Sequence, residues 1–283
     1  MSEIRLEGLS YYHGKDTPYE IKALKNINLT IPSGRITGLI GHTGSGKSTL
    51  VQMLNGLLCP HEGRVLLNGE DIWANPKDIR SVRFRVGLVM QYPEYQLFEE
   101  TVAKDIAFGP KNMGLAEEEI HLRVAEAARF AGLEPELLDR SPFDLSGGQK
   151  RRAAIAGIIA MRPEILLFDE PAAGLDPRGR DSIFENICAY HRESGNTVLI
   201  VSHSMEDMAR YCDHLIVMNE GSVMMEGDPD DIFSHAETLS QVGLDIPQIT
   251  KLMMILRKQG VPLDERIYTV EQALDAVKKL IKK

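Results

Sequence analysis

The sequence predicts an α/β fold with a mostly parallel sheet, on three observations. A short apolar segment at 35–40 passes into a glycine-rich loop, and apolar residues recur at helical spacing over 48–58. Strand, glycine loop and helix in this order are typical of a βα unit in a parallel sheet. The runs at 165–168 and 198–201 are continuously apolar, as in strands buried on both faces. Between the glycine-rich loop and the strand at 165–168, residues of about 95–160 show helical patterns, which indicates an inserted helical subdomain.

The other elements have local signals of their own. Residues 4–8 and 27–31 alternate as strands do, and a Pro-Ser-Gly turn follows at 32–34. Acidic residues at 117–119 open a helix near its positive N-terminal end. The segment 214–226 predicts a closing hairpin around an Asn-Glu-Gly turn.

The chain changes character near its end. Residues 234–283 carry two or three short helical patterns, and the last has apolar residues at Val270, Leu274, Val277 and Ile281. Thr269 and Gln272 fit a capping box at its start. We therefore expect a main domain over 1–232 and a small helical appendage over 233–283.

The composition excludes several classes of protein. A net charge of -9 over 283 residues argues, weakly, against a nucleic-acid binder, which needs clustered Lys and Arg. Three scattered cysteines without a CxxC pair indicate reduced thiols in a cytosolic protein. The first residues lack the basic and apolar regions of a secretory signal. The longest apolar run, 153–161, is far below the roughly 18 residues that a membrane span needs.

Residues 41–48 match the pattern GxxxxGK[ST] at every fixed position. Glycines let backbone N–H groups approach phosphate oxygens closely, and the following helix directs its positive end at the anion. Lys47 is expected to reach the β- and γ-phosphates, and the Ser48 hydroxyl to bind Mg²⁺. The residues expected to contact ATP here are Gly41, His42, Thr43, Gly44, Ser45, Gly46, Lys47, Ser48 and Thr49.

Two carboxylates end the apolar strand at 165–168. Ligands of parallel α/β sheets lie at the carboxyl ends of the strands, where the glycine loop also lies. We expect Asp169 to bind Mg²⁺ and Glu170 to polarise the attacking water. A strand that simply leaves the sheet through acidic residues is the alternative.

The segment 145–149, Leu-Ser-Gly-Gly-Gln, lies about a hundred residues after the glycine loop and shortly before the acid pair. Here the sequence resembles the ATP-binding-cassette (ABC) ATPases, whose signature is LSGGQ. Ser146 and the glycines precede a helix expected over 149–161, which makes a second anion-binding helix start. In this family that start faces the ATP held by a partner subunit. The resemblance thus implies nucleotide contacts for Ser146, Gly147, Gly148 and Gln149.

The resemblance covers residues 1 to about 232 and implies the remaining parts of an ABC ATPase. The fold would be that of a P-loop NTPase, with a mostly parallel core sheet, an N-terminal antiparallel β subdomain and a helical insert. Gln91 resembles the Q-loop glutamine that contacts Mg²⁺ or water, and Asp176 resembles the D-loop aspartate at the dimer interface. His203 resembles the switch histidine that touches the γ-phosphate. With Glu170, Gln91 and His203 form the expected catalytic set.

An aromatic ring that stacks on adenine is expected near the N-terminus. Tyr11 and Tyr12 both qualify, and His13 lies in the same window. Both tyrosines could equally be ordinary strand residues.

Within the family, the match tightens toward the ATPases of energy-coupling-factor transporters, which import vitamins and transition-metal ions. The segments 17–24, 41–44, 91–98 and 108–112 carry this resemblance. It implies a second ABC ATPase subunit, identical or different, a transmembrane coupling subunit and a membrane substrate-binding component, with no nucleic acid. The chain would then lie at the cytoplasmic face of the cell membrane as a peripheral protein that hydrolyses ATP.

Alternatives remain beside this reading. The chain could serve another class of ABC importer, act as a soluble cassette on DNA or ribosomes, or bind ATP without cleaving it. Apolar residues after Gln91 are expected to line a groove for a helix of the membrane subunit, or to pack the helical insert: Tyr92, Pro93, Tyr95, Leu97 and Phe98. The C-terminal appendage could strengthen contact between two ATPases or hold a regulatory ligand.

Overall fold

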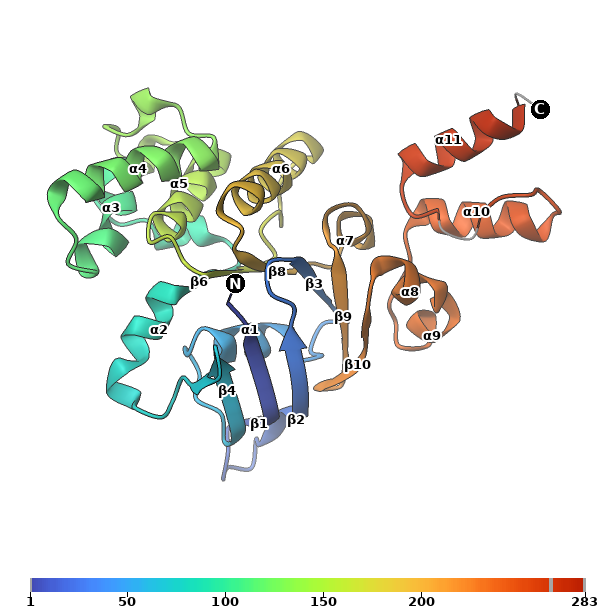
Figure 1. Ribbon diagram of the computed structural model, residues 1–283, viewed down its shortest axis with the longest axis horizontal. Helices are drawn as coiled ribbons and strands as arrows, with labels where there is room; N and C mark the ends of the chain where they lie inside the picture. The colour runs from blue at the N-terminus through green and yellow to red at the C-terminus, as the bar shows by residue number, and fades with distance from the viewer. Residues whose placement is uncertain (1, 265–266, 282–283) are drawn as a thin grey trace.

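A six-stranded sheet forms the centre of the molecule, of which the computed structural model describes residues 2–264 and 267–281. Its strands are β3 (Ile36–Ile40), β6 (Val86–Val89), β7 (Ile165–Asp169), β8 (Thr197–Val201), β9 (His214–Asn219) and β10 (Ser222–Gly227). They lie in the order β10-β9-β3-β8-β7-β6 (Figure 1). Neighbouring strands from β9 to β6 run parallel, whereas β10 pairs with β9 antiparallel. The predicted parallel core and closing hairpin are confirmed.

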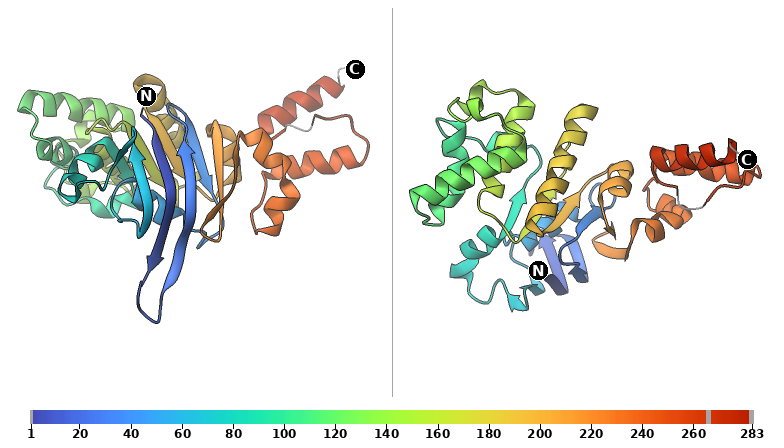
Figure 2. Two further views of the ribbon diagram at one scale, coloured as in Figure 1. Left: turned by 60° about the horizontal axis from the view of Figure 1, so that its bottom comes forward. Right: turned by 45° about the horizontal axis from the view of Figure 1, so that its top comes forward.

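A second sheet is antiparallel and comes from the N-terminal part of the chain. Its strands are β1 (Ile4–His13), β2 (Ile21–Ile31), β4 (Glu62–Leu67) and β5 (Glu70–Asp71), in the order β2-β1-β4-β5. The long β1–β2 hairpin extends away from the rest of the molecule (Figure 2). The sequence analysis predicted parts of β1 and β2 but not β4 and β5.

The core sheet separates two apolar layers, because successive side chains of a strand point to opposite faces. In β7, Leu166 and Phe168 pack toward the helices, whereas Ile165 and Leu167 pack toward helix α1 (Lys47–Leu54) and the antiparallel sheet. All four are nearly inaccessible to solvent. Burial on both faces explains why this strand reads as a continuous apolar run.

Helices surround the core sheet and form the predicted helical subdomain at one end (Figure 1). They are α2 (Ile79–Arg85), α3 (Val102–Asn112), α4 (Glu117–Ala131), α5 (Gly147–Ile159), α6 (Pro177–Ser194) and α7 (Met205–Tyr211). Short 3₁₀ turns lie at Pro76–Asp78, Pro93–Gln96, Pro135–Leu137 and Pro142–Asp144. Helices α3, α4 and α5 pack against one another and make up the insert.

Two helix boundaries differ from the expected ranges for local reasons. Helix α5 starts two residues earlier than expected, because Ser146 caps it and the Gln149 side chain reaches back to the Ser146 N–H. Helix α1 ends at Leu54 rather than at residue 58, and Gly56 follows in the left-handed region at φ 69°.

Within the described residues after β10, 228–264 and 267–281, the chain forms the helices α8 (Pro229–Ser234), α9 (Ala236–Gln241), α10 (Gln248–Lys258) and α11 (Val270–Ile281). Ile232, Phe233 and Leu239 still pack into the large core, whereas α10 and α11 enclose a small core of their own around Met253 and Ala273. Helices α10 and α11 project from the body on the side opposite the helical subdomain (Figure 1). The expected capping box of Thr269 and Gln272 is present at the start of α11. A division at residue 232 stays a prediction.

Candidate functional site

A cavity of about 690 Å³ opens at the carboxyl ends of the parallel strands. The loop after β3 carries the glycine-rich segment, β6 leads to Gln91, β7 to Asp169 and Glu170, and β8 to His203. All four of these side chains line the cavity, although 112 positions separate the first from the last in the sequence. Because the strands are parallel, their ends meet at one edge of the sheet, and the predicted catalytic set meets there.

The glycine-rich loop forms the floor of the cavity. Its lining residues are Thr43, Gly44, Gly46, Lys47, Ser48 and Thr49, whereas Gly41, His42 and Ser45 are not among them. Gly46 is the N-cap of α1 with φ 101°, and a Cβ there would lie 2.7 Å from the Ala23 carbonyl oxygen. The loop therefore depends on glycine at this position. A Cβ on Gly44 would meet no atom within 4 Å, which is the open space that a phosphate chain requires.

Lys47 is buried and anchored within the loop. Its Nζ donates hydrogen bonds to the carbonyl oxygens of Gly41 at 2.7 Å and His42 at 3.0 Å. Burial lowers the pKa of Lys47, and the negative charges of Glu170 and Asp169 counteract this shift. A cation with few solvent contacts at the floor of the loop is suited to an anionic ligand.

Glu170 and His203 form a pair at the wall of the cavity. His203 Nε2 lies 3.1 Å from Glu170 Oε1, an atom that is buried and has no hydrogen-bond partner in the described structure. The Glu170 backbone adopts the left-handed region at φ 53° while its N–H donates to the Val201 carbonyl at 3.0 Å. The strand end thus turns this carboxylate toward the cavity.

The electrostatics of this pair fit proton transfer near neutral pH. Burial raises the pKa of Glu170 to about 7, and Asp169 adds to the shift, while Lys47 and the His203 N–H oppose it. Burial and the charge of Lys47 lower the pKa of His203. The imidazole is therefore mostly neutral at pH 7, and the close contact with Glu170 is not an ion pair. A carboxyl group that titrates near 7 is matched to act as a general base.

Of the three rings at residues 11–13 that were considered for adenine stacking, only that of His13 is at the cavity. It lines the cavity, and its Nε2 lies 3.2 Å from the Thr49 hydroxyl. Tyr11 packs against the core beneath the antiparallel sheet, and Tyr12 donates from its hydroxyl to Glu62 at 3.4 Å. Neither tyrosine is among the lining residues. The structure therefore favours His13, the third residue of that window, over the two expected positions.

The signature segment and the D-loop residue lie outside the cavity. Ser146 and Gly147 are exposed, and the Ser146 Oγ accepts a hydrogen bond from Gln149 N at 3.3 Å in a capping box. Asp176 caps α6 by accepting from Gly179 N at 2.8 Å. Neither segment contributes to the cavity of its own chain. The start of α5 therefore presents free helical N–H groups outward.

Sequence reasoning missed the contribution of β2 and of the β9–β10 turn. Lys22, Lys25 and Glu220 line the cavity beside the loop. The Gly221 N–H donates to the Ser45 carbonyl at 3.0 Å, and its carbonyl accepts from Lys25 N at 2.8 Å. These contacts join segments far apart in the chain, and no local pattern in the sequence indicates them.

No group of three or more His, Cys, Asp or Glu side chains is placed to hold a metal ion within residues 2–264 and 267–281. Over the same residues, no helix has the length and apolar character needed to cross a membrane.

Comparisons with known proteins agree with this geometry. A family model described as ABC transporter matches residues 24–173. The energy-coupling factor transporter ATP-binding protein EcfA2 of Caldanaerobacter subterraneus subsp. tengcongensis is 53% identical over 274 residues, covering 97% of this chain and 96% of that protein. The EcfA2 of Clostridium tetani is 51% identical, covering 95% of this chain and 94% of that protein.

Solved structures lead to the same family. The cbiO1 protein of Clostridium perfringens, part of the ABC transporter complex cbiONQ, has a TM-score of 0.75 at 40% identity, covering 89% of this chain and 98% of that one. A cassette solved as a dimer in a post-hydrolysis state with ADP and Pi has a TM-score of 0.71 at 29% identity, covering 80% and 98%. The chain therefore belongs to the ABC transporter family, among the energy-coupling factor transporter ATP-binding proteins, and is an ATP-hydrolysing transporter subunit.

Proposed function

We propose that this ATPase drives uptake of a vitamin or a transition-metal ion as one of two cassettes that hold ATP between them. Each ATP would lie between the glycine-rich loop of one chain and the α5 start of the other. One observation carries this proposal. The two anion-binding helix starts of the chain are separate, since residues 43–49 line the cavity and the exposed Ser146 and Gly147 do not.

The residues of the cavity then have distinct roles in hydrolysis. Lys47 and the loop N–H groups hold the β- and γ-phosphates, and Glu170 accepts a proton from the attacking water. Glu170 lines the cavity, and its Oε1 accepts no hydrogen bond from the described residues. His203 directs its Nε2 to the same point and is placed to donate to the γ-phosphate. Gln91 lies on the cavity wall, where it can orient the water.

A magnesium ion fits the side chains of this cavity. Ser48, Gln91 and Asp169 all line it and offer oxygen donors, which Mg²⁺ prefers. When bound, the ion would supply positive charge that neutralises the negative charge developing on the phosphates. Ser48 is in the first turn of α1, which faces the expected phosphates, and Asp169 is the last residue of β7, directly before Glu170. We assign adenine stacking to His13, with Tyr11 and Tyr12 as the earlier candidates.

The paired arrangement is tested by trapping it. A Glu170→Gln variant should bind ATP, form a stable pair and turn over very slowly, because the general base is lost. Adding Ser146→Arg should abolish the ATP-dependent pair, since a bulky cation would replace the helix cap at the partner's phosphates. Ser240→Arg, at an exposed serine of α9, is the matched control.

The pair is measured by mass photometry on the assembly that copurifies with a tagged copy of the chain, with and without ATP. This design covers two identical and two different cassettes alike. If Ser146→Arg pairs as well as Ser240→Arg does, the proposed sandwich is wrong. Near-normal turnover of Glu170→Gln would assign the base to another residue.

The site for the membrane coupling subunit is proposed at a groove beside the helical subdomain. The groove has a volume of about 350 Å³, and Leu97, Phe98 and Phe108 line it. Phe98 is 58% exposed and meets the Phe108 ring edge-on at 5.0 Å. Tyr95, three residues before Phe98 in the chain, is 85% exposed. Exposed aromatic residues around an apolar groove are typical of a surface that receives an amphipathic helix.

Among the other predicted groove residues, Pro93 is buried and Tyr92 lies against the guanidinium of Arg151, with 5.7 Å between the guanidinium carbon and the ring centroid. Tyr92 is 42% exposed, and neither residue is among those that line the groove.

The groove is tested by Tyr95→Asp, with Tyr19→Asp as control because Tyr19 is equally exposed, at 84%, in the β1–β2 hairpin. We expect Tyr95→Asp to release the chain from membranes and Tyr19→Asp to leave it bound, measured by sedimentation of membrane vesicles. Equal membrane binding of the two variants would remove the groove proposal. Through this contact, the chain would lie peripherally at the cytoplasmic face of the membrane.

A further inference from the structure

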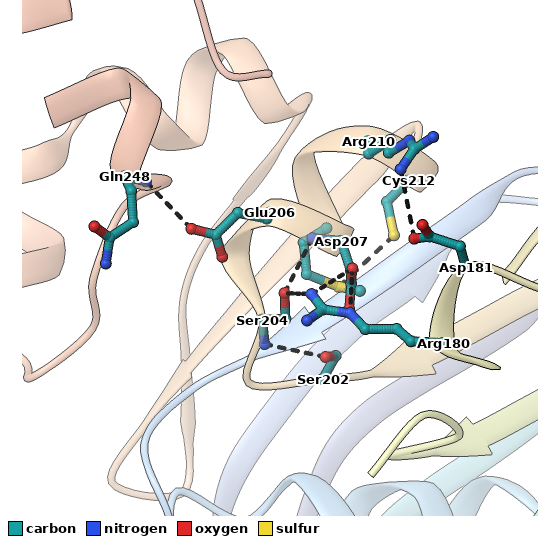
Figure 3. A network of polar contacts seen from close by, with 10 residues as sticks. Arg180, Asp181, Ser202, Ser204, Glu206, Asp207, Arg210, Cys212 and Gln248 are labelled. Atoms are coloured by element: carbon teal, nitrogen blue, oxygen red, sulfur yellow. Dashed lines mark hydrogen bonds and ion pairs between the residues drawn. The ribbon is translucent and has the colours of Figure 1, made fainter. Parts of the chain in front are cut away.

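A network of polar contacts surrounds the loop that carries His203 (Figure 3). The Ser204 N–H donates to Ser202 Oγ at 3.1 Å, so the backbone is pinned across His203. Ser204 is also the N-cap of α7, and its Oγ accepts from Asp207 N at 3.2 Å. The residues on both sides of His203 are thus fixed to the start of α7.

Arg180 of α6 reaches this network with its guanidinium group. Its Nε lies 2.8 Å from each carboxylate oxygen of Asp207, and its Nη2 lies 2.5 Å from Oδ1. The same Nη2 also donates to Ser204 Oγ. Asp207 is only 5% exposed, whereas the Arg180 side chain is 35% exposed, so the guanidinium reaches a buried carboxylate from the surface. A planar fork bound to a buried carboxylate has a well-defined geometry, which it passes on to the cap of α7.

The other end of Arg180 is fixed at the start of α6. Its N–H donates to the Asp176 carbonyl at 2.9 Å, and Asp176 caps the helix. A single residue therefore connects the segment at Gly174–Asp176 with the loop at His203. The two partners of the side-chain contact, Arg180 and Asp207, are 27 positions apart in sequence.

The His203 side chain has little packing of its own that could fix its direction. It is 54% exposed, and its Nε2 contact is with Glu170. An exposed side chain takes its direction largely from the backbone to which it is attached. Contacts that immobilise residues 202–204 therefore restrain where the imidazole points, together with its contact to Glu170.

We propose that Arg180 is a positioning residue for His203: by holding Ser204 and Asp207, it keeps the imidazole aligned with Glu170 and couples that alignment to the start of α6. The inference rests on the role proposed for His203 in hydrolysis. Arg180 does not line the nucleotide cavity, so it would influence the rate of the chemical step only through His203.

The experiment compares Arg180→Gln with Arg210→Gln in the full-length chain. Arg210 pairs with Asp181 at 3.5 Å and joins the same two helices, but it does not touch the His203 loop in the contacts described. We expect Arg180→Gln to lower kcat roughly 10- to 100-fold, because misplaced catalytic groups lose this much rate. The Kd for ATP should stay within about twofold, since the cavity lining is unchanged. Arg210→Gln should change neither.

A double-mutant cycle asks whether Arg180 acts through His203. If it does, the double variant should have nearly the same single-turnover rate as His203→Ala alone. If the two residues act independently, the rate losses of the two single variants should multiply in the double variant. Amide hydrogen exchange at 202–204 gives a readout that does not depend on residual activity. Exchange should be faster in Arg180→Gln than in Arg210→Gln, because the loop has lost its anchor.

A variant that removes both charges guards against misfolding. Arg180→Gln combined with Asp207→Asn leaves no unpaired buried carboxylate, and it should fold yet show the same loss of kcat. If this variant and Arg180→Gln both have normal kcat while His203→Ala is slow, the positioning role of Arg180 is wrong but the role of His203 stands. Multiplicative effects in the cycle, or unchanged exchange at 202–204, would overturn it as well. Full turnover of His203→Ala would remove the role of His203 and this inference together.

Discussion

The ion pair between Arg151 and Glu94 gives the most demanding test of how the site is assembled. Arg151 lies on α5 and is 3% exposed, and its Nε and Nη2 donate to Glu94 at 3.0 and 2.7 Å. Its Nη1 donates to the carbonyls of Ala173 at 2.6 Å and Pro171 at 3.3 Å. One side chain thus ties the signature helix to the segment after Gln91 and to the segment after the acid pair.

Replacing Arg151 by Met leaves a carboxylate that is 15% exposed without its cation, and leaves two carbonyls without this donor. Burial is the largest single influence and raises the pKa of Glu94, but the hydrogen bonds and charge of Arg151, together with a backbone hydrogen bond, outweigh it, so the net shift is downward. Breaking a buried pair on one side costs roughly 3–5 kcal/mol. At about 2–4 °C per kcal/mol for a chain of this size class, Tm should fall by roughly 6–20 °C.

The assay is thermal unfolding of the nucleotide-free chain, followed by circular dichroism. Arg35→Met is the control, since Arg35 and Asp228 form a pair at 3.5 Å with side chains 52% and 69% exposed. An exposed pair contributes about 0–1 kcal/mol, so this Tm should move by no more than about 4 °C. Arg151→Met with Glu94→Gln should recover part of the loss, because the unpaired charge is gone. Equal Tm values for the two single Arg variants would refute the reasoning.

The remaining predictions concern pH, a helix cap and a backbone conformation. Hydrogen bonds from Arg85 lower the pKa of Glu164 to about 2, below the ordinary value of 4.5, so this pair stabilises the protein above pH 4.5 and its contribution is lost as the pH falls toward 2. Since the carboxylate is 36% exposed, screening limits the effect to about 1 kcal/mol. Glu164→Gln should lower Tm by a few degrees at pH 7, and by progressively less as the pH falls below 4.5. Ser146→Ala should cost about 1 kcal/mol in thermal unfolding through loss of its cap, and a stability equal to wild type would contradict the capping role. Gly46→Ala should abolish binding of a fluorescent ATP analogue, because its Cβ would lie 2.7 Å from the Ala23 carbonyl oxygen of β2. Gly69→Ala, at a glycine of similarly positive φ that does not line the cavity, should leave binding unchanged, and equal binding by the two variants would be inconsistent with the loop geometry.

The sequence predicted most of the site because its motifs are local. Residues 41–48 and the acid pair each combine a strand end with the chemistry that follows it, and the parallel sheet brings such ends together. The capping box at Thr269 was equally readable, since both partners lie within one turn. The one at Ser146 was missed, and the helix that it starts was expected two residues too late. What could be predicted was therefore set by short separations along the chain.

The parts that could not be predicted depend on contacts between distant segments or on irregular strands. The register of β1 against β2 shifts between Leu9 and Tyr11 and again between Tyr11 and Tyr12, so alternation cannot tell which ring faces the cavity. His13 is the ring that does. Arg151 and Glu94 are 57 positions apart, and no local sequence pattern around either residue indicates that they form an ion pair.

The left-handed conformation of Glu170 has a consequence for how this enzyme can evolve. A non-glycine residue in this region carries a strain of order 1 kcal/mol, which glycine or asparagine would relieve. Random substitutions at residue 170 that make the fold more robust are therefore expected to be ones that silence it. Selection for stability alone would therefore favour inactive variants at this position, and selection for ATP hydrolysis is what retains Glu170.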